Sequence, residues 1–254
     1  MIPLMFQLVV RQKVLMGVLA CLVIGSPLVA QTAFEKDTIQ TTAGPLQITF
    51  IGHGTLMMAW KGKTIHVDPY ARLTDYSRLP KADLVLVTHH HSDHLDSKAL
   101  EVVCTDSTVI LLTKLCAEQV GKGIVVTNGD ARTVLGMKIE AVPAYNVVHK
   151  RPDGKPFHSK GEGNGYVITF GATRVYVAGD TECTPEMKAL KGIDVAFLPM
   201  NLPYTMTPVQ VAEAAKAFRP KVLYPYHYGE SNVGELAGLL QGDKGIEVRI
   251  RRMP

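Results

Sequence analysis

Residues 88–96 read THHHSDHLD and hold four histidines and two aspartates within nine positions. The spacing His-x-His-x-Asp-His runs through His89, His91, Asp93 and His94. Side chains two positions apart on an extended segment point the same way, so the first two imidazoles can converge on one ion. The last two side chains, at the bend that follows, can face a second ion. Imidazole with an added carboxylate suits zinc, iron or manganese, and the spacing therefore favours a metal centre over a chance histidine-rich loop.

Two later segments offer further ligands at predicted strand ends. Asp180 follows the apolar run VYVA, and Gly179 before it permits a close backbone approach. His227 ends another apolar run, in YPYHYG. A single aspartate at a strand end is more often a helix cap, but beside the first motif we interpret Asp180 as a ligand.

Strands and helices must bring these residues together. ADLVLV, directly before the histidines, is an apolar run with the length of a strand covered on both faces. GTLMMAW and TIHVDPY read as a hairpin, and SKALEVV as a helix capped by Asp96 or Ser97. Helices that begin Thr-Pro at Thr184 and Thr207 alternate with buried strands near the C-terminus. We predict one domain over residues 46–254, with more than one sheet and with helices outside.

The ordered set of motifs resembles the metallo-β-lactamase-fold superfamily of metal-dependent hydrolases. The resemblance is to the branch described as ascorbate-phosphate-lactonase-like, or beta-lactamase superfamily domain. It covers about residues 46–229 and rests on the segments FIGHGTLMM, TIHVDP, THHHSDHLD, PAYN, HSKGEGNGY, AGDTE and YPYHYG. It implies an α/β fold, a four-layer αββα sandwich with the metals at one edge of the sheets.

The same resemblance assigns the ligands residue by residue. It implies that His89, His91 and a third histidine bind a first metal, that Asp93, His94 and His227 bind a second, and that Asp180 bridges both. His149 and His158 both fall in the interval of the third histidine. His158 is favoured, because it opens HSKGEGNGY, which is similar to the turn around the family's ligand. His149 would then be a loop residue able to contact substrate.

Further polar residues are predicted to lie behind the ligands, at the same edge of the sheets. The resemblance places His53 and Asp68 there, and Asp68 could fix a ligand imidazole by accepting its hydrogen bond. A structural turn aspartate before Pro69 is the alternative. His66 reads as strand packing. Tyr145, Tyr204, Tyr226 and Tyr228 lie in or near predicted loops, where one of them could stabilise an oxyanion, although packing is the commoner role.

The resemblance implies an enzyme that binds two divalent ions, zinc first and manganese or iron as alternatives. A hydroxide held between the ions would cleave an ester-type bond of a small molecule, a lactone or phosphodiester above others, with Asp93 and Asp180 as catalytic residues. A β-lactamase-like amide hydrolase and a non-catalytic metal-binding protein are the alternatives.

Composition and charge narrow the partners and the compartment. The formal charge of +4 includes Arg11 and Lys13 of a leader, and no basic run with aromatics indicates nucleic acid. Residues 1–30 have the order of a signal peptide, which predicts a secreted or periplasmic protein, with a membrane anchor or a lipoprotein at Cys21 as alternatives. Residues 31–45 read as a loose N-terminal segment. Cys104, Cys116 and Cys183 remain after the leader, and we expect free thiols rather than a disulfide between the first two.

Overall fold

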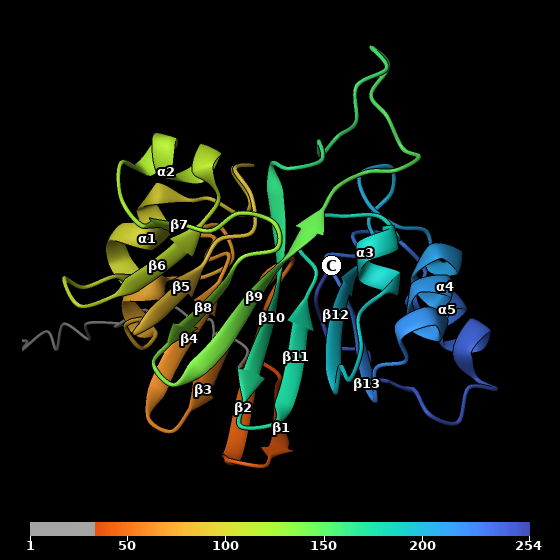
Figure 1. The fold of residues 1–254 in the computed structure, drawn as a ribbon, viewed down its shortest axis with the longest axis horizontal. Coiled ribbons are helices and arrows are strands. Elements are labelled where there is room, and N and C mark those ends of the chain that lie inside the picture. Colours follow the sequence, from red (N-terminus) through yellow and green to blue (C-terminus); the bar gives the residue numbers. More distant parts are fainter. Residues whose placement is uncertain (1–33) are drawn as a thin grey trace, which may run out of the picture. The chain divides into compact units, whose positions relative to one another are not determined.

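The computed structural model describes residues 34–254, so the predicted signal peptide over residues 1–30 lies outside the described part of the chain. Two seven-stranded sheets pack face to face, and helices cover their outer faces (Figure 1). The predicted four-layer αββα sandwich is confirmed.

The first sheet takes its strands from the earlier half of the chain, in sequence order across the sheet. They are β1 (Lys36–Thr41), β2 (Gly44–Gly52), β3 (Thr55–Trp60), β4 (Lys63–Val67), β5 (Leu84–Leu86), β6 (Val109–Leu112) and β7 (Ile124–Val125). Strands β1 to β4 are antiparallel neighbours, and β4 to β7 run parallel. Strands β3 and β4 form the predicted hairpin. The carboxyl ends of the parallel strands therefore share one edge.

The second sheet repeats this plan with the later half of the chain. Its strands are β8 (Ala131–Val134), β9 (Met137–Ala144), β10 (Gly163–Phe170), β11 (Thr173–Val177), β12 (Val195–Pro199), β13 (Val222–Tyr226) and β14 (Glu247–Val248). Strands β8 to β11 are antiparallel, and β11 to β14 are parallel. A long loop between β9 and β10 projects beyond the sheets at the end where β9 stops (Figure 1).

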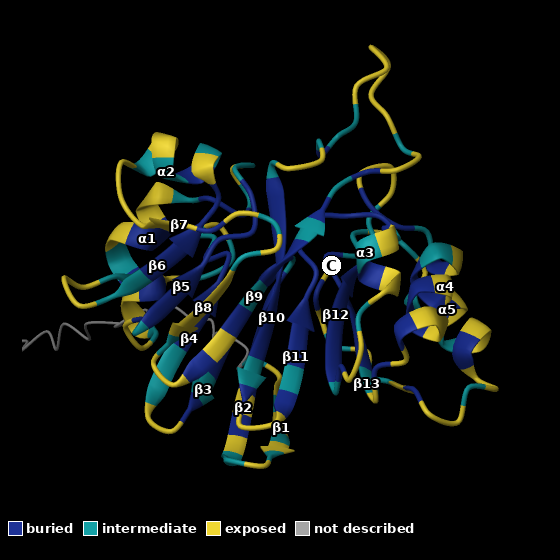
Figure 2. Cartoon of the chain, viewed as in Figure 1, coloured by how far each residue is buried: buried dark blue, intermediate teal, exposed yellow. Residues whose placement is uncertain are grey.

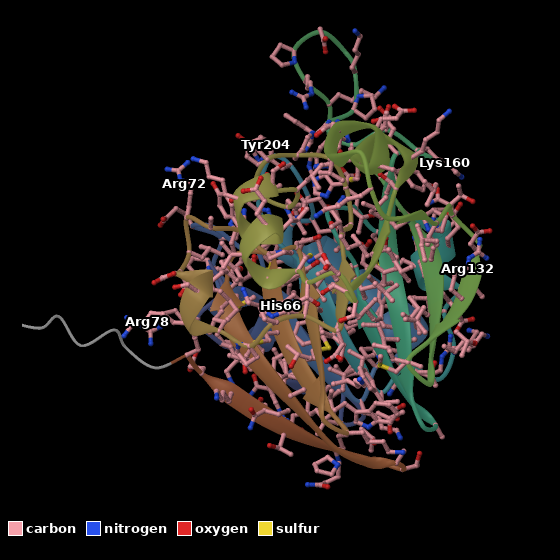
Figure 3. The ribbon with its side chains drawn as sticks, turned by 90° about the vertical axis from the view of Figure 1, so that its left-hand side faces the viewer. His66, Arg72, Arg78, Arg132, Lys160 and Tyr204 are labelled. Carbon is pink, nitrogen blue, oxygen red and sulfur yellow. The ribbon has the colours of Figure 1, made fainter. Side chains whose placement is uncertain are left out.

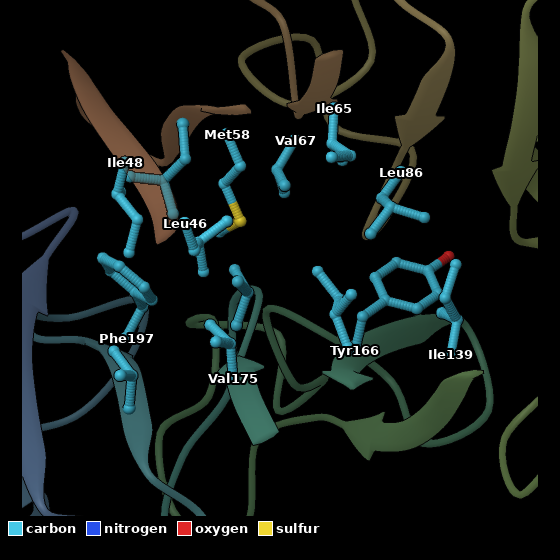
Figure 4. Packing of buried hydrophobic residues seen from close by; sticks show 14 of the residues in the cluster. Leu46, Ile48, Met58, Ile65, Val67, Leu86, Ile139, Tyr166, Val175 and Phe197 are labelled. Carbon is cyan, nitrogen blue, oxygen red and sulfur yellow. The ribbon is translucent and has the colours of Figure 1, made fainter. Parts of the chain in front are cut away.

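The main core lies between the two sheets. Ile48, Met58 and Leu86 of the first sheet face Tyr166 and Phe197 of the second (Figure 4). All five are at most 2% exposed, and each such side chain stabilises the fold by about 1.5–3 kcal/mol. The inner strands are therefore buried along most of their length, while the helices keep exposed outer faces (Figure 2).

Smaller cores lie under the helices. The 3₁₀ helix η1 (Tyr76–Arg78), α1 (Ser97–Val103) and α2 (Lys114–Val120) pack on the first sheet; α3 (Pro185–Lys188), α4 (Pro208–Phe218) and α5 (Val233–Leu240) pack on the second. Asp96 caps α1, because its carboxylate accepts hydrogen bonds from the first-turn amides. Thr184 and Thr207 cap α3 and α4, as predicted. Within residues 34–254, no helix has the length and hydropathy needed to cross a bilayer.

The predicted loose segment of residues 31–45 is in fact a strand from Lys36 onward, and this prediction is wrong for that part. β1 pairs with β2 from Lys36 opposite Thr49 to Thr41 opposite Gly44. Ile39 packs against the main core, and Asp37 accepts hydrogen bonds from Arg251. β2 follows β1 directly, so the two strands form a hairpin that the polar local sequence did not reveal, whereas Arg251 lies far away in the chain.

Candidate metal centre

The predicted ligands gather at the edge where parallel strands of both sheets end. Asp68 follows β4, and the residues 88–94 follow β5. Asp180 follows β11, His227 follows β13, and His158 stands shortly before β10. Two backbone hydrogen bonds join the sheets at this edge: the amide of Asn164 donates to Thr88, and the amide of His227 donates to His53. The fold therefore brings together donors that lie up to 174 positions apart in sequence.

Three groups of donor atoms, each within 4.8 Å of one another, can be drawn at this edge. They are His89, His91 and His158; His53, Asp93, His94 and His227; and His89, His94 and Asp180. The structure thus brings all seven predicted ligands together, with His53 as an eighth donor.

The first group has imidazole nitrogens turned toward a common point. Nε2 of His89 lies 3.1 Å from Nδ1 of His91. The hydroxyl of Thr88 donates to Asp68 and so accepts from Nδ1 of His89, which leaves Nε2 of His89 with a free lone pair. His158 completes the group. Lone pairs at this spacing repel each other unless a cation or a proton lies between them.

The second group is built around Asp93. Its Oδ2 lies 2.9 Å from Nε2 of His53, 3.7 Å from Nε2 of His227 and 3.8 Å from Nε2 of His94. We predicted that His53 lies behind the ligands, but the structure places it among the donors. His53 can therefore act as a ligand or hold the carboxylate of Asp93.

Asp180 lies between the two groups. Its carboxylate oxygens are 3.4 Å from Nε2 of His94, 3.4 Å from Nε2 of His158 and 3.5 Å from Nε2 of His227. Nε2 of His89 is 4.0 Å away. This is the position that a ligand shared by two ions requires.

Three buried polar atoms at this point lack a hydrogen-bond partner among residues 34–254: His94 Nε2, His227 Nε2 and Asp180 Oδ1. An unpaired buried polar group costs about 1–3 kcal/mol, and native proteins rarely keep several side by side. All three atoms are typical metal ligands. The residues present therefore fit a bound metal.

Burial and charge act against each other on these groups. Burial raises the pKa of Asp180, but the imidazoles of His227 and His94 outweigh burial and hold this pKa well below its usual range. Burial lowers the pKa of His94, but the carboxylates of Asp180 and Asp68 outweigh it and raise this pKa to about 9. Burial lowers the pKa of His91 to about 4. Because carboxylates that draw a proton onto His94 also attract a metal cation, protons and metal compete for the centre.

Two polar residues orient the imidazoles from behind. The fully buried carboxylate of Asp68 accepts a hydrogen bond of 2.8 Å from Nδ1 of His94, and hydrogen bonds from the amide and hydroxyl of Thr88. Asn146 accepts a hydrogen bond of 3.0 Å from Nδ1 of His158. These contacts fix which ring nitrogen faces the centre.

Sequence reasoning missed Glu182, which anchors the loop between β9 and β10. Its carboxylate is buried and accepts hydrogen bonds from the amides of Val147, Val148 and His149. It also accepts a hydrogen bond from the side-chain Nδ2 of Asn146, and this contact turns the side-chain oxygen of Asn146 toward His158. Buried acceptors of this kind give no local signal in a sequence.

His149, the rival for the third histidine position, lies outside the three donor groups. Its Nδ1 is 2.7 Å from Glu182 and 2.9 Å from the carbonyl of Thr205. The structure therefore places His158, and not His149, beside His89 and His91.

Backbone strain is concentrated at the same edge. His53, Asp68 and His227 have φ of 52°, 45° and 45°, in the left-handed region that non-glycine residues rarely adopt. Such strain costs of order 1–3 kcal/mol each and persists where surrounding structure holds it. The three residues are thus aimed at the centre at a cost to stability.

A cavity of about 480 Å³ opens onto the donors. His53, His91, Asp93, His158, Asp180 and His227 line it, together with Ser92, Arg151, Phe157, Asn201 and Tyr204. Arg151 and Phe157 belong to the loop between β9 and β10. Asn201 was missed, although it follows the end of β12 as the ligands follow other strands. Tyr204 lies at the end of the molecule where the β9–β10 loop projects (Figure 3).

Other predicted candidates lie away from the cavity. Nε2 of His66, whose side chain is labelled in Figure 3, contacts the carbonyl of Pro80 within the fold. The hydroxyl of Tyr226 accepts from the amide of Gly179, and that of Tyr145 donates to Glu186. Cys104, Cys116 and Cys183 are free thiols, as expected.

Comparison with known proteins agrees with this geometry. The family described as "Beta-lactamase superfamily domain" matches residues 47–227. A solved structure from Parabacteroides distasonis, assigned as a metal-dependent hydrolase, is 50% identical with a TM-score of 0.83, and the match covers 87% of this chain and 100% of that one. A metallo hydrolase from Ignicoccus hospitalis is 25% identical with a TM-score of 0.67, over 82% of this chain and 96% of its own. A UPF0173 metal-dependent hydrolase of Methanopyrus kandleri is 31% identical, covering 72% of this chain and 84% of its own.

The matched range of residues 47–227 holds every donor described above, from His53 to His227. The chain therefore belongs to the beta-lactamase superfamily domain family and is a metal-dependent hydrolase of the metallo-β-lactamase fold.

Proposed function

We propose that the chain hydrolyses an ester-type bond of a small molecule, either a lactone or a phosphodiester. The reaction would use two divalent cations, and zinc is favoured over manganese or iron. The observation that carries the proposal is the convergence of His94 Nε2, His227 Nε2 and Asp180 Oδ1, buried and without hydrogen-bond partners among the described residues. Two of these residues, Asp180 and His227, also line a cavity large enough for a small molecule.

His89, His91 and His158 would hold one cation, and Asp93, His94 and His227 the other, with Asp180 between them. Cations bound there would lower the pKa of a coordinated water toward about 7 and polarise the bond to be cleaved.

Asp93 is the residue best placed to handle the proton. Its side chain is 34% exposed and lines the cavity, whereas Asp180 is buried. Burial raises the pKa of Asp93, but the nearby imidazoles of His227 and His53 outweigh burial and keep the pKa far below its usual range. Asp93 therefore stays ionised, and can accept a hydrogen bond from the attacking water and pass its proton toward His53 at 2.9 Å.

The proposal is tested by elemental analysis of the purified protein, followed by chelation and reloading with zinc, manganese or iron. Each form is assayed on lactone, phosphodiester and β-lactam substrates. We expect activity on a lactone or phosphodiester that disappears on chelation and returns with metal. Metal-loaded protein that is inactive on all ester substrates, or chelated protein that stays fully active, would contradict the proposal.

Replacing Asp93 by alanine should lower kcat/KM by about 10²–10⁴-fold, since it removes a proton acceptor and a ligand. Circular dichroism should show the fold retained, because this carboxylate is partly exposed at the edge of the core. Asp106→Ala, which removes an exposed aspartate between α1 and β6, is the matched control. Full activity of the metal-replete Asp93→Ala variant would rule out the proposed role.

A further inference from the structure

Arg151 is the permanently charged cation among the residues that line the cavity. Its guanidinium lies 5.2 Å from the ring centroid of Phe157, and its Nη2 donates to the carbonyl of Phe157 at 3.3 Å. Among residues 34–254, no carboxylate forms an ion pair with it. A guanidinium over an aromatic ring keeps most of its N–H donors free for a planar or tetrahedral oxyanion.

The loop that carries Arg151 is built to hold it in place. The amide of Arg151 donates to Lys155 at 2.7 Å, and the amide of Gly154 donates back to Arg151 at 2.9 Å. The base of the loop is fixed by the three amides that donate to the buried Glu182. Binding an anion therefore costs less ordering of this loop than binding by a free surface arginine.

Aromatic rings form the wall beside this cation. The rings of Phe157 and Tyr204 meet edge to face with centroids 5.1 Å apart, and both residues line the cavity. An aromatic wall next to a guanidinium, with metal ligands in the same cavity, provides separate places for an apolar part, an anion and a scissile bond.

We propose that the substrate carries an oxyanion, a carboxylate or a phosphate, apart from the bond that is cleaved, and that Arg151 binds this oxyanion while Phe157 and Tyr204 pack against the apolar part. The inference rests on the proposed function, because it names the class of substrate for the same site. Asp93 and Asp180, the two carboxylates that line the cavity, contact imidazoles, and neither forms an ion pair with Arg151.

The test compares p-nitrophenyl esters whose acyl chain ends in a carboxylate, a phosphate or a neutral methyl ester. In the metal-loaded wild-type protein, kcat/KM for at least one charged ester should exceed that for the neutral ester. Arg151→Gln should lower the ratio of kcat/KM for the charged ester to kcat/KM for the neutral ester by about tenfold to a hundredfold. This is the effect expected from the loss of a charge-assisted hydrogen bond. The better charged substrate identifies the oxyanion.

Lys155→Gln is the matched control, because it removes one positive charge from the same loop at a residue that does not line the cavity. Its ratio should equal that of the wild type. An equal fall in both variants, or no fall in Arg151→Gln, overturns the inference.

Binding separates this inference from the proposed function. If no ester is hydrolysed, the hydrolysis proposal fails, and the affinity of metal-loaded protein for benzoate and phenyl phosphate still tests Arg151. We expect Arg151→Gln to weaken one of these by at least about tenfold. If each anion binds the variant with the same dissociation constant as it binds the wild type, the role of Arg151 is overturned.

Discussion

Three imidazoles at the centre are oriented by a second residue. Asp68 holds His94, Thr88 holds His89, and Asn146 reaches His158. None of these partners would bind a metal in the proposed arrangement, yet each fixes which nitrogen can do so. The loss of such a partner is expected to weaken metal binding about 10–100-fold without removing a ligand.

The choice between His158 and His149 can be tested by single substitutions. His158→Ala should reduce bound metal per chain, measured by elemental analysis, and lower kcat/KM by at least about 10²-fold. His149→Ala should keep the wild-type metal content, because its imidazole contacts Glu182 and Thr205 instead of the donor groups. The assignment is wrong if His149→Ala loses as much metal as His158→Ala.

At the scale of elements, the loop between β9 and β10 connects the proposed oxyanion site to the proposed metal ligands. One end of the loop carries Asn146, the other carries His158, and Arg151 lies between them. Glu182, which follows β11, holds the loop from a separate part of the chain. Movement of this loop would therefore disturb both Arg151 and the imidazole of His158.

Replacing Glu182 by glutamine should loosen this loop. The new amide group would place donor hydrogens against amides that already donate, at a cost of about 1–3 kcal/mol. Hydrogen–deuterium exchange at Val147, Val148 and His149 should accelerate, with a higher KM. In the control Glu186→Gln, which alters a carboxylate bonded to Tyr145 and Lys160, these amides should exchange at the wild-type rate. Unchanged exchange in Glu182→Gln would show that the carboxylate does not anchor the loop.

Local sequence predicted elements well where their signals are local. The Thr-Pro starts of α3 and α4 cap those helices, and the run ADLVLV contains β5. β1 was missed because its own residues are mostly polar and its ion-pair partner Arg251 is distant in the sequence. The proposed ligands Asp180 and His227 were predicted because each follows an apolar strand, and the motif at residues 89–94 because of its spacing, whereas His158 was favoured by the family resemblance. Glu182, Asn146 and Arg151 were missed because their roles depend on how a long loop folds back.

At the scale of the whole molecule, the network around Asp37 ties β1 to the end of the described chain. Arg251 donates to both carboxylate oxygens of Asp37, at 2.8 and 2.7 Å, and the hydroxyl of Tyr224 donates to the same carboxylate. Burial raises the pKa of Asp37, but these hydrogen bonds and the charge of Arg251 outweigh burial, so the pKa lies below its usual value. A carboxyl whose pKa is lowered on folding stabilises the fold above its unfolded pKa of about 3.9.

Asp37→Asn should therefore lower the free energy of unfolding at pH 7 by about 1–3 kcal/mol. The difference from the wild type should shrink as the pH falls below about 3.9 and through the lowered pKa, because the wild-type carboxyl then becomes protonated as well. Urea unfolding from pH 7 down to about pH 2.5 measures both effects. A difference that stays constant over this range would refute the electrostatic explanation.

The two sheets come from successive halves of the chain, and the proposed ligands are divided between those halves. His89 to His94 belong to the first half, and His158, Asp180 and His227 to the second. A complete coordination shell can therefore form only after the sheets have docked. An ion would then bind with its full set of ligands late in folding and would not act as a folding nucleus. Metal is then expected to slow unfolding while leaving the refolding rate nearly unchanged, which stopped-flow measurements with and without a chelator would reveal.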